Sequence, residues 1–445
     1  MEWYWTLACL IGAILVLMAA GLPVGMAFIT VNVVAAVSYL GGSGDLFEIS
    51  ERGVGILASN AFESMTTFAL VPIPMFLLMG ELFFHTGLAN RMFTSVEKLM
   101  GRVPARLSYV TVAGGTAFAT LSGSSMGSTA LLGTLMVPEM TKRGYKKTMS
   151  IGPILGTGGL AMMIPPSALA VLLGTLAELD IGKLLIAGVL PGLILAAMYI
   201  VLIYVMAKRD PDAAPAYDIE YIPWARRFKL LFRDVVPMVS VVIGVIILIM
   251  GGIATPSEAA AFGCLGVLLL AVCYRSLTLK STWTSMEGAS RVTIMALLII
   301  FGSATFSQIL AFSGASSGLI NWVTQFDLDP LVMLMVMFGI LLVLGMFMDQ
   351  LSMMLLTVPI FFPLAIKFGF DPIWFGVIIL LALEISFTTP PFGLLLFVMQ
   401  GVSPPGTKFS EICIAAIPFM ACAMLLVALI IIFPGIATWL PSLSN

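Results

Sequence analysis

A polar break at residues 121–129 lies between two apolar segments that are each too short to cross a bilayer. A hydrocarbon core about 30 Å thick requires about 20 apolar residues in one continuous helix. Two half-length segments around this Gly/Ser tip therefore predict a re-entrant helical hairpin at 108–140. The next apolar run, 148–177, is interrupted at 156–159 and again at Pro165-Pro166, which predicts a helix that unwinds midway.

Broken backbone is tolerated at membrane depth only where protein buries it or where it lines a cavity. The pattern is typical of the binding sites of secondary transporters. It recurs in the second half of the chain, where a polar break at 349–352 precedes a double proline. Three landmarks reappear there at one constant offset: Pro138 as Pro363, Gly144 as Gly369, and the double proline at 165 as the one at 390. The repetition predicts two homologous halves.

Composition places the chain in the membrane. Sixty per cent of its residues are hydrophobic and 10% are charged, which excludes a soluble globular protein and predicts an all-α integral membrane protein. No basic tract alternates with aromatic residues, so no nucleic-acid partner is expected, and the lipid bilayer is the expected surroundings. The five cysteines lie in apolar runs without ligand-like spacing, which is typical of small buried hydrophobic residues.

The predicted organisation is an inverted repeat with two re-entrant hairpins and two broken helices. The first half, 1–207, contains scaffold spans, an amphipathic arm helix at 88–106, the hairpin at 108–140 and the broken helix at 148–177. A cytoplasmic linker is predicted at 208–234. The second half, 235–434, contains an arm helix at 313–329, a hairpin at 331–366 and a broken helix at 372–400, and a tail follows at 435–445.

The distribution of positive charge predicts the orientation. All lysines and arginines except Arg52, Lys183 and Lys367 fall in segments that this organisation places on one side of the membrane. By the positive-inside rule that side is cytoplasmic. The N-terminus is then periplasmic, and the two hairpins enter the membrane from opposite sides.

The breaks predict one oxygen-lined pocket in each half, because a helix end offers N–H groups to an anion or C=O groups to a hard cation such as Na⁺. The first sodium site is predicted to contain Ser122, Gly123, Ser124, Ser125, Gly156, Gly158, Gly159 and Pro165. The second is predicted to contain Asp349, Ser352, Ser386, Thr388 and Thr389. An anionic substrate is expected between the two sites, near Ser125, Ser128, Pro166, Ser167, Pro390 and Pro391.

Other interpretations of these residues stay open. Ser/Gly clusters in membrane helices also allow close helix packing. Asp349, ionisable within an apolar run, indicates a cation-linked function. Glu81 and Glu384 lie at similar depth, but we expect them to cap broken backbone or to face a helix partner rather than to bind a ligand directly. His85, the only histidine, is expected at the membrane interface. Neither a permanent metal cofactor nor covalent chemistry is expected.

Six motifs occur together along nearly the whole chain: Leu121-Ser-Gly-Ser-Ser125, Val137-Pro-Glu-Met-Thr-Lys-Arg-Gly-Tyr145, Ile164-Pro-Pro-Ser167, Ala254-Thr-Pro-Ser-Glu-Ala-Ala260, Met346-Phe-Met-Asp349 and Thr388-Thr-Pro-Pro-Phe-Gly393. Together they resemble the large membrane subunit (the M, or DctM-like, subunit) of tripartite ATP-independent periplasmic (TRAP) transporters. One departure is Ser386, where many relatives have glycine, so the geometry of the second cation site follows less directly from the resemblance.

The resemblance implies an elevator-type secondary transporter of the bacterial inner membrane that is driven by a Na⁺ gradient and has no cofactor. It implies sodium sites at the two tips and their facing breaks. It also implies two partners, a small four-helix membrane subunit (Q or DctQ-like) and a periplasmic substrate-binding protein (P or DctP-like). The binding protein would deliver an organic anion such as a C4-dicarboxylate, a keto acid or a sialic acid. Because the chain begins directly with its first predicted span, the small subunit is expected to be a separate polypeptide.

Two alternatives to this function differ in mechanism. A stand-alone Na⁺/dicarboxylate symporter would need no binding protein, but such proteins carry Ser-Asn-Thr motifs at their tips and this chain has none there. A membrane-embedded enzyme is the other alternative, since Gly42-Ser-Gly-Asp45 is similar to an aspartyl-protease motif. Asp45 and Asp218 are predicted on opposite sides of the membrane and cannot share a proton. His85 has no Gly-x-Ser-Gly partner at the first tip, so we predict a transporter and not an enzyme.

Overall fold

The computed structural model describes residues 2–39, separate positions between 48 and 66, and residues 68–100, 103–215, 223–326, 328–390 and 393–443. These residues form helices, and the described part of the chain contains no strand. By length and composition, six described helices can cross a membrane, or up to eight if each of two bent helix pairs counts as one span. The prediction of an all-α protein with several apolar helices is confirmed.

The helices of the first half follow one another with short connections. They are α1 (Trp3–Ala19), α2 (Val24–Tyr39), η1 (Phe68–Leu70), α4 (Pro72–His85), α5 (Leu88–Leu99), α6 (Arg106–Ser122), α7 (Ser125–Lys142), α8 (Lys147–Met163), α9 (Ala168–Leu176) and α10 (Ile181–Arg209). In the rest of the chain they are η2 (Pro211–Ala213), α11 (Trp224–Leu230), η3 (Leu231–Val235), α12 (Val236–Met250), α13 (Pro256–Cys273), α14 (Leu279–Phe312), α15 (Ala315–Thr324), α16 (Pro330–Leu344), α17 (Gln350–Lys367), α18 (Pro372–Phe387), α19 (Leu394–Val402), α20 (Phe409–Ile432) and α21 (Gly435–Ser442).

The helix boundaries repeat at the spacing of the sequence repeat. The offset that relates Pro138 to Pro363 also relates both ends of α7 to those of α17, and the start of α8 to the start of α18. In each half a double proline follows this helix, and a short helix, α9 or α19, comes next. The α8–α9 pair is bent by 47° at the break between its two helices.

One predicted break was wrong, and two other predicted segments contain helices. The helix predicted to unwind at 156–159 is continuous there, because α8 ends only at Met163, before the double proline. The predicted linker, 208–234, contains α11, which continues through the π-helix η3 into α12 as one helical segment. The predicted tail, 435–445, contains α21, which packs against α10. Glycine only lowers helix propensity, whereas a double proline removes backbone donors and clashes with the preceding turn.

The two predicted arm helices are shorter than expected. α5 ends at Leu99 rather than 106, and α15 ends at Thr324 rather than 329. Pro104 lies inside the first predicted range and Pro330 directly follows the second. Because the residue before a proline is disfavoured in the helical conformation, neither helix reaches its predicted end. α5 is amphipathic, with Leu88, Met92 and Phe93 buried, and it meets α4 at an angle of 65°.

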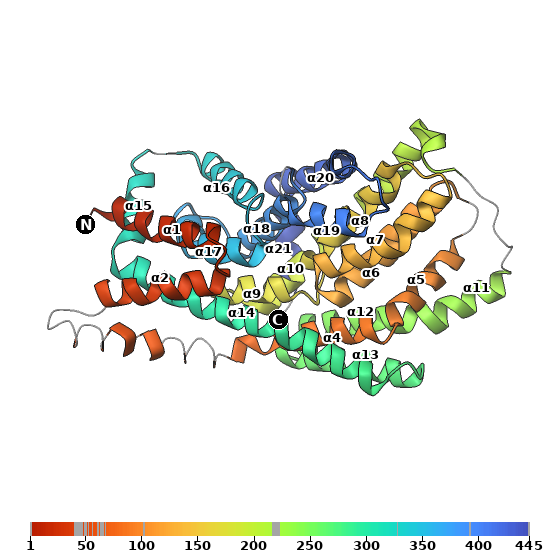
Figure 1. Cartoon of the computed structure of the whole chain (residues 1–445), viewed down its shortest axis with the longest axis horizontal. Coiled ribbons are helices and arrows are strands. Elements are labelled where there is room, and N and C mark those ends of the chain that lie inside the picture. Colours follow the sequence, from red (N-terminus) through yellow and green to blue (C-terminus); the bar gives the residue numbers. More distant parts are fainter. Residues whose placement is uncertain are drawn as a thin grey trace.

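The centre of the molecule is built on α8 and α18. Every residue from Met149 to Met163 and from Trp374 to Phe387 is buried, as is typical of helices that are surrounded by protein on all sides. α8 packs against α6, α7, α10 and α20, and α18 packs against α16, α17 and α10. The longest helix, α14, runs beside α2 and α4 along one side of this centre (Figure 1).

Candidate functional site

A cavity of about 340 Å³ lies where the two polar tips of the sequence repeat come together. The first tip contributes residues 123–126, from the α6–α7 connection and the start of α7, and the second contributes 349–351, at the start of α17. The remaining walls come from the start of α9 and from single faces of α4 and α14. The two tips therefore border one shared cavity.

Three helices begin at the wall of this cavity, and each is capped by a side chain. Ser124 accepts a hydrogen bond from the Gly127 N–H (3.1 Å) at the start of α7. Ser167 accepts one from the Ala170 N–H (3.2 Å) at the start of α9. Asp349 accepts from the N–H groups of Leu351 (3.0 Å) and Ser352 (3.2 Å) at the start of α17. Helix N-termini carry partial positive charge and favour an anion nearby.

The first tip presents oxygen atoms to α8 and to the break that follows it. Ser125 and Thr129 lie one turn apart on α7, and within the described residues their buried hydroxyls have no hydrogen-bond partner. A methyl group added at Gly158 would overlap the Thr129 hydroxyl and lie 3.3 Å from the Ser125 carbonyl oxygen. One added at Gly123 would lie 3.6 Å from the carbonyl oxygen of Pro166. Such hydroxyls and carbonyls suit a hard cation, so these residues fit Na⁺.

The other predicted members of the first site behave differently. The glycines at 156, 158 and 159 were predicted to form a break that offers free carbonyls, which is wrong, because all three lie inside α8. Side chains of other helices occupy the space that these glycines leave: Phe419 and Tyr199 at Gly156, and Glu384 at Gly159. Ser122 ends α6 and Pro165 lies in the α8–α9 break; the side chain of Ser122 falls outside the described residues.

Among the residues predicted for the second sodium site, only Asp349 lines the shared cavity. Its carboxylate also accepts a hydrogen bond from the Ser352 hydroxyl. The hydroxyls at the end of α18 donate to backbone of their own helix: Ser386 to Leu383 O (2.9 Å), Thr388 to Ile385 O (3.0 Å) and Thr389 to Ile385 O (2.6 Å). Each keeps lone pairs that can accept a further bond. Ser386 packs against Gly345, just before the second tip.

Only some of the residues that were predicted to lie near the substrate are brought together at the cavity. Ser125 lines the cavity, whereas Ser128 and Ser167 are fully buried beside it. Pro166 lies in the α8–α9 break and Pro390 in the connection between α18 and α19. Pro391 falls outside the described residues.

Two further polar side chains line the cavity, Glu81 of α4 and Gln350 of α17. Glu81 Oε2 lies 3.1 Å from Nε2 of His85, and Gly288 of α14 leaves space for the Glu81 carboxylate. Within the described part of the chain Gln350 Nε2 has no hydrogen-bond partner. Sequence reasoning left Glu81 outside the site, although an ionisable residue within an apolar run was a usable signal.

Comparison with known proteins identifies the family. The family model described as "Tripartite ATP-independent periplasmic transporter, DctM component" matches residues 11–436. The chain is 31% identical over 405 residues to the C4-dicarboxylate TRAP transporter large permease protein DctM of Pseudomonas aeruginosa, covering 91% of this chain and 93% of that protein. It is 29% identical over 435 residues to the sialic acid TRAP transporter large permease protein SiaM of Vibrio cholerae, covering 96% of each.

The fold is similar to that of a solved transporter of low sequence identity. The Alcanivorax borkumensis YdaH transporter superposes with a TM-score of 0.63 at 12% identity, over 88% of this chain and 90% of that one. This similarity concerns the fold alone. On the family model and the curated relatives, the chain belongs to the DctM-component family, the large permease subunits of TRAP transporters, which are multi-pass membrane transporters and not enzymes.

Proposed function

We propose that this permease uses a Na⁺ gradient to move a small organic anion across the bacterial inner membrane after a periplasmic binding protein has delivered it. The observation that supports this proposal best is the single cavity bordered by both tips, with the N-termini of α7, α9 and α17 at its wall. The N-termini of α7 and α9 favour a negatively charged ligand, whereas that of α17 already holds the Asp349 carboxylate. The names of relatives that act on C4-dicarboxylate and sialic acid support a carboxylate-bearing substrate.

In this proposal, Na⁺ binding next to the cavity couples substrate uptake to the Na⁺ gradient. Asp349 places a carboxylate at the wall, and Ser125 and Thr129 offer hydroxyls with no protein partner in the described residues. A substrate anion and Na⁺ bound close together neutralise each other's charge, which lowers the cost of holding either one away from water. Binding of one therefore favours binding of the other, and the Na⁺ gradient drives uptake.

Movement follows an elevator mechanism in this proposal. The tips, α8 and α18 form a densely buried core, whereas α4 and α14 contribute only one wall of the cavity. The core would move relative to α4 and α14, with α5 and α15 as arms between the two parts. The small membrane subunit would associate with the outer helices, the N-terminus would be periplasmic, and residues 208–234 would be cytoplasmic.

The test is uptake into proteoliposomes that contain this chain and its small partner subunit. Binding proteins loaded with a dicarboxylate, a keto acid or a sialic acid are added with and without an imposed Na⁺ gradient. The informative variant is Asp349→Asn, which retains helix capping and removes the charge. Asp371→Asn is the matched control, because Asp371 caps α18 by accepting from the Trp374 N–H (2.8 Å) and does not line the cavity.

Uptake is expected to require a binding protein and Na⁺, to fall at least about tenfold in Asp349→Asn, and to persist in Asp371→Asn. Uptake of free substrate without any binding protein would favour the stand-alone symporter instead. Na⁺-independent uptake would contradict the assignment of the tips as cation sites. For the elevator step, a bifunctional crosslink between cysteines introduced at Met126 and Met295 should stop transport and leave binding-protein docking intact.

A further inference from the structure

The wall that α4 and α14 contribute to the shared cavity carries an isolated acid. Ile73, Leu77 and Glu81 line the cavity from α4, and because they are spaced four residues apart they form one stripe along the helix. The residues that line it from α14 are Val292, Met295 and Ala296. Among these described residues Glu81 alone is polar. A few polar groups in a largely apolar wall fix the orientation of a bound small molecule.

Packing between α4 and α14 holds Glu81 in place. The hydroxyl of Ser285 on α14 donates to the backbone carbonyl oxygen of Glu81 at 3.1 Å. Three residues further along α14, a methyl group added at Gly288 would lie 2.8 Å from the carboxyl carbon of Glu81. The Glu81 side chain is nevertheless 31% exposed. The carboxyl is therefore supported by protein on one side and remains open to the cavity.

A carboxyl in this position can recognise a hydrogen-bond donor. Its Oε2 atom lies 3.1 Å from Nε2 of His85, and the described residues give the carboxyl no other hydrogen-bond or ion-pair partner. Since a carboxylate has about four lone-pair sites, Glu81 can accept further bonds from a ligand. A ligand hydroxyl can donate to it. A second ligand carboxylate has no donor when ionised and would be repelled by like charge.

The tips supply a complementary set of donors. The N-termini of α7 and α9 favour a ligand carboxylate. Within the described part of the chain Gln350 Nε2 has no hydrogen-bond partner, so its N–H groups are available to the same carboxylate. The Asp349 carboxylate is already engaged by the N–H groups at the start of α17. Donors for an anion therefore lie at the tips, and an acceptor for a donor lies on α4.

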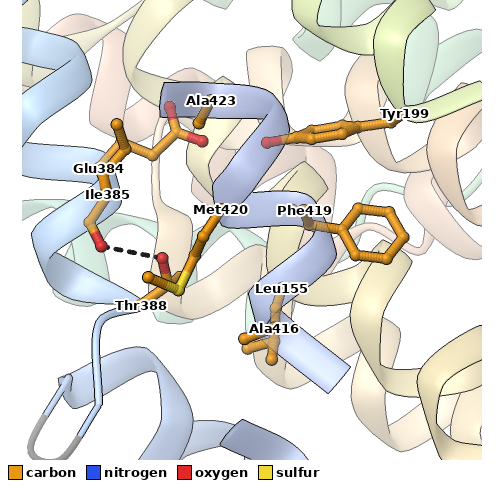
Figure 2. A pocket seen from close by; sticks show the side chains of 10 residues that line it. Leu155, Tyr199, Glu384, Ile385, Thr388, Ala416, Phe419, Met420 and Ala423 are labelled. Carbon is orange, nitrogen blue, oxygen red and sulfur yellow. Dashed lines mark hydrogen bonds between the residues drawn. The ribbon is translucent and has the colours of Figure 1, made fainter. Parts of the chain in front are cut away.

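The other glutamate at membrane depth, Glu384, is not accessible to such a ligand. It borders a separate chamber of about 10 Å³ inside the helical centre, which is room for about one water molecule. Figure 2 shows the Glu384 carboxyl and the Tyr199 hydroxyl pointing toward one another across this chamber. The shared cavity, at about 340 Å³, lies within the size range of small-molecule sites.

We propose that Glu81 is a specificity-determining residue that selects anions with a hydroxyl group in addition to a single carboxylate. The substrate is then a hydroxylated acid, such as a sugar acid, rather than a simple dicarboxylate or keto acid. A hydroxyl fits this wall better than an ammonium group, because burial of a charge against apolar side chains costs far more than burial of a hydroxyl that is hydrogen-bonded. The inference rests on the proposed transport function, since it concerns the substrate of the same cavity.

Ligand-induced stabilisation of the detergent-purified complex with the small subunit tests the inference without a binding protein. The probes are gluconate, adipate and hexanoate, which share a six-carbon chain and carry hydroxyls, a second carboxylate or neither. The rise of the unfolding temperature with probe concentration gives an apparent dissociation constant for each. In the presence of Na⁺, gluconate should bind at least about tenfold more tightly than adipate or hexanoate. If gluconate does not bind, or is not preferred, the inference is wrong.

Substitutions of Glu81 separate ligand recognition from a structural function. In Glu81→Leu hexanoate should bind at least as tightly as gluconate, whereas Glu81→Gln retains an acceptor oxygen and should keep the preference for gluconate. Glu287→Leu is the matched control on α14, because Glu287 is exposed and does not line the cavity. A lower unfolding temperature of Glu81→Leu with an unchanged order of the probes would mean that Glu81 only supports packing. If Glu81→Leu does not fold, the order of the probes in the unchanged protein and in Glu81→Gln still decides.

The same measurements distinguish failure of this inference from failure of the transport function. Preference for gluconate that is independent of Na⁺ would contradict Na⁺ coupling and leave the assignment of Glu81 intact. Na⁺-dependent binding of all three probes with equal strength would support an anion transporter and overturn the assignment of Glu81.

Discussion

Arg91 of α5 donates through its Nε to Oδ1 of Asp234 at 2.6 Å, and this contact joins the predicted arm helix to the π-helix η3. Ser95, one turn further along α5, donates to the other carboxylate oxygen at 3.1 Å. The Arg91 guanidinium also lies 4.2 Å from the centre of the Tyr274 ring, just beyond α13. Burial and, secondly, the nearby charge of Asp234 raise the pKa of the Tyr274 hydroxyl. The Asp234 side chain is only 6% exposed, so a largely buried carboxylate holds the arm to the outer helices.

Replacing Arg91 by alanine should destabilise the protein by about 1.5–3 kcal/mol, because a buried charge loses its strongest hydrogen bond. Unfolding in detergent, followed by circular dichroism, measures the effect. Arg291→Ala is the control, since Arg291 forms a similar pair with Glu287 at 3.2 Å but both side chains are exposed. That change should cost less than about 1 kcal/mol. Equal effects of the two substitutions would mean that the Arg91 contact does not hold the arm.

Removing the two unpartnered hydroxyls of α7 should change the Na⁺ requirement more than stability. In the double variant Ser125→Ala with Thr129→Ala, the loss of the two hydroxyls leaves no described protein group without its hydrogen-bond partner. The free energy of unfolding should therefore change by less than about 1 kcal/mol. The Na⁺ concentration for half-maximal uptake should rise at least about tenfold, as expected when cation ligands are lost. Thr134→Ala, also on α7, removes a hydroxyl that donates to Ala130 O and should leave the Na⁺ dependence unchanged. An unchanged Na⁺ dependence in the double variant would exclude these hydroxyls as ligands.

A bulky side chain in the shared cavity should block substrate without unfolding the protein. Met295 lines the cavity from α14 and is 49% exposed, so Met295→Trp adds volume without disturbing a packed core. Uptake should fall at least about tenfold, since the indole occupies space that a bound ligand needs. Met286 is also 49% exposed but lines a different groove between α4 and α14, and Met286→Trp should transport normally. Equal uptake by both variants would place the substrate elsewhere.

Gly159, near the end of α8, should tolerate no side chain while Glu384 is present. Gly159→Ala forces a methyl group into the carboxyl of Glu384, which should cost about 1–3 kcal/mol in unfolding free energy. The second change Glu384→Ala should restore much of this loss by making room. Gly244→Ala in α12 is the control, because nothing lies within 4 Å of the added methyl group. If Gly159→Ala is as harmless as this control, the packing of Glu384 against α8 is wrong.

The sequence by itself determined the helical class and most places where helices begin or end. Apolar segment length, the double proline and the capping side chains act over a few residues, so their effects are readable locally. Asp349 caps α17 and Ser124 caps α7, both at predicted tips. The internal repeat was visible as well, because the two halves carry the same local signals at one constant offset.

Only the tertiary structure decided whether the glycines of α8 interrupt the helix, and which helices line the cavity. Gly156 and Gly159 looked like a break, but α8 stays helical because side chains from α10, α18 and α20 fill the spaces that they leave. Glu81 enters the cavity wall because α4 packs beside α14, a helix from the other half of the chain. Contacts of this kind depend on how the surfaces of helices that are distant in sequence fit together. The periodic pattern of apolar residues along one helix does not show which other helix will pack against it.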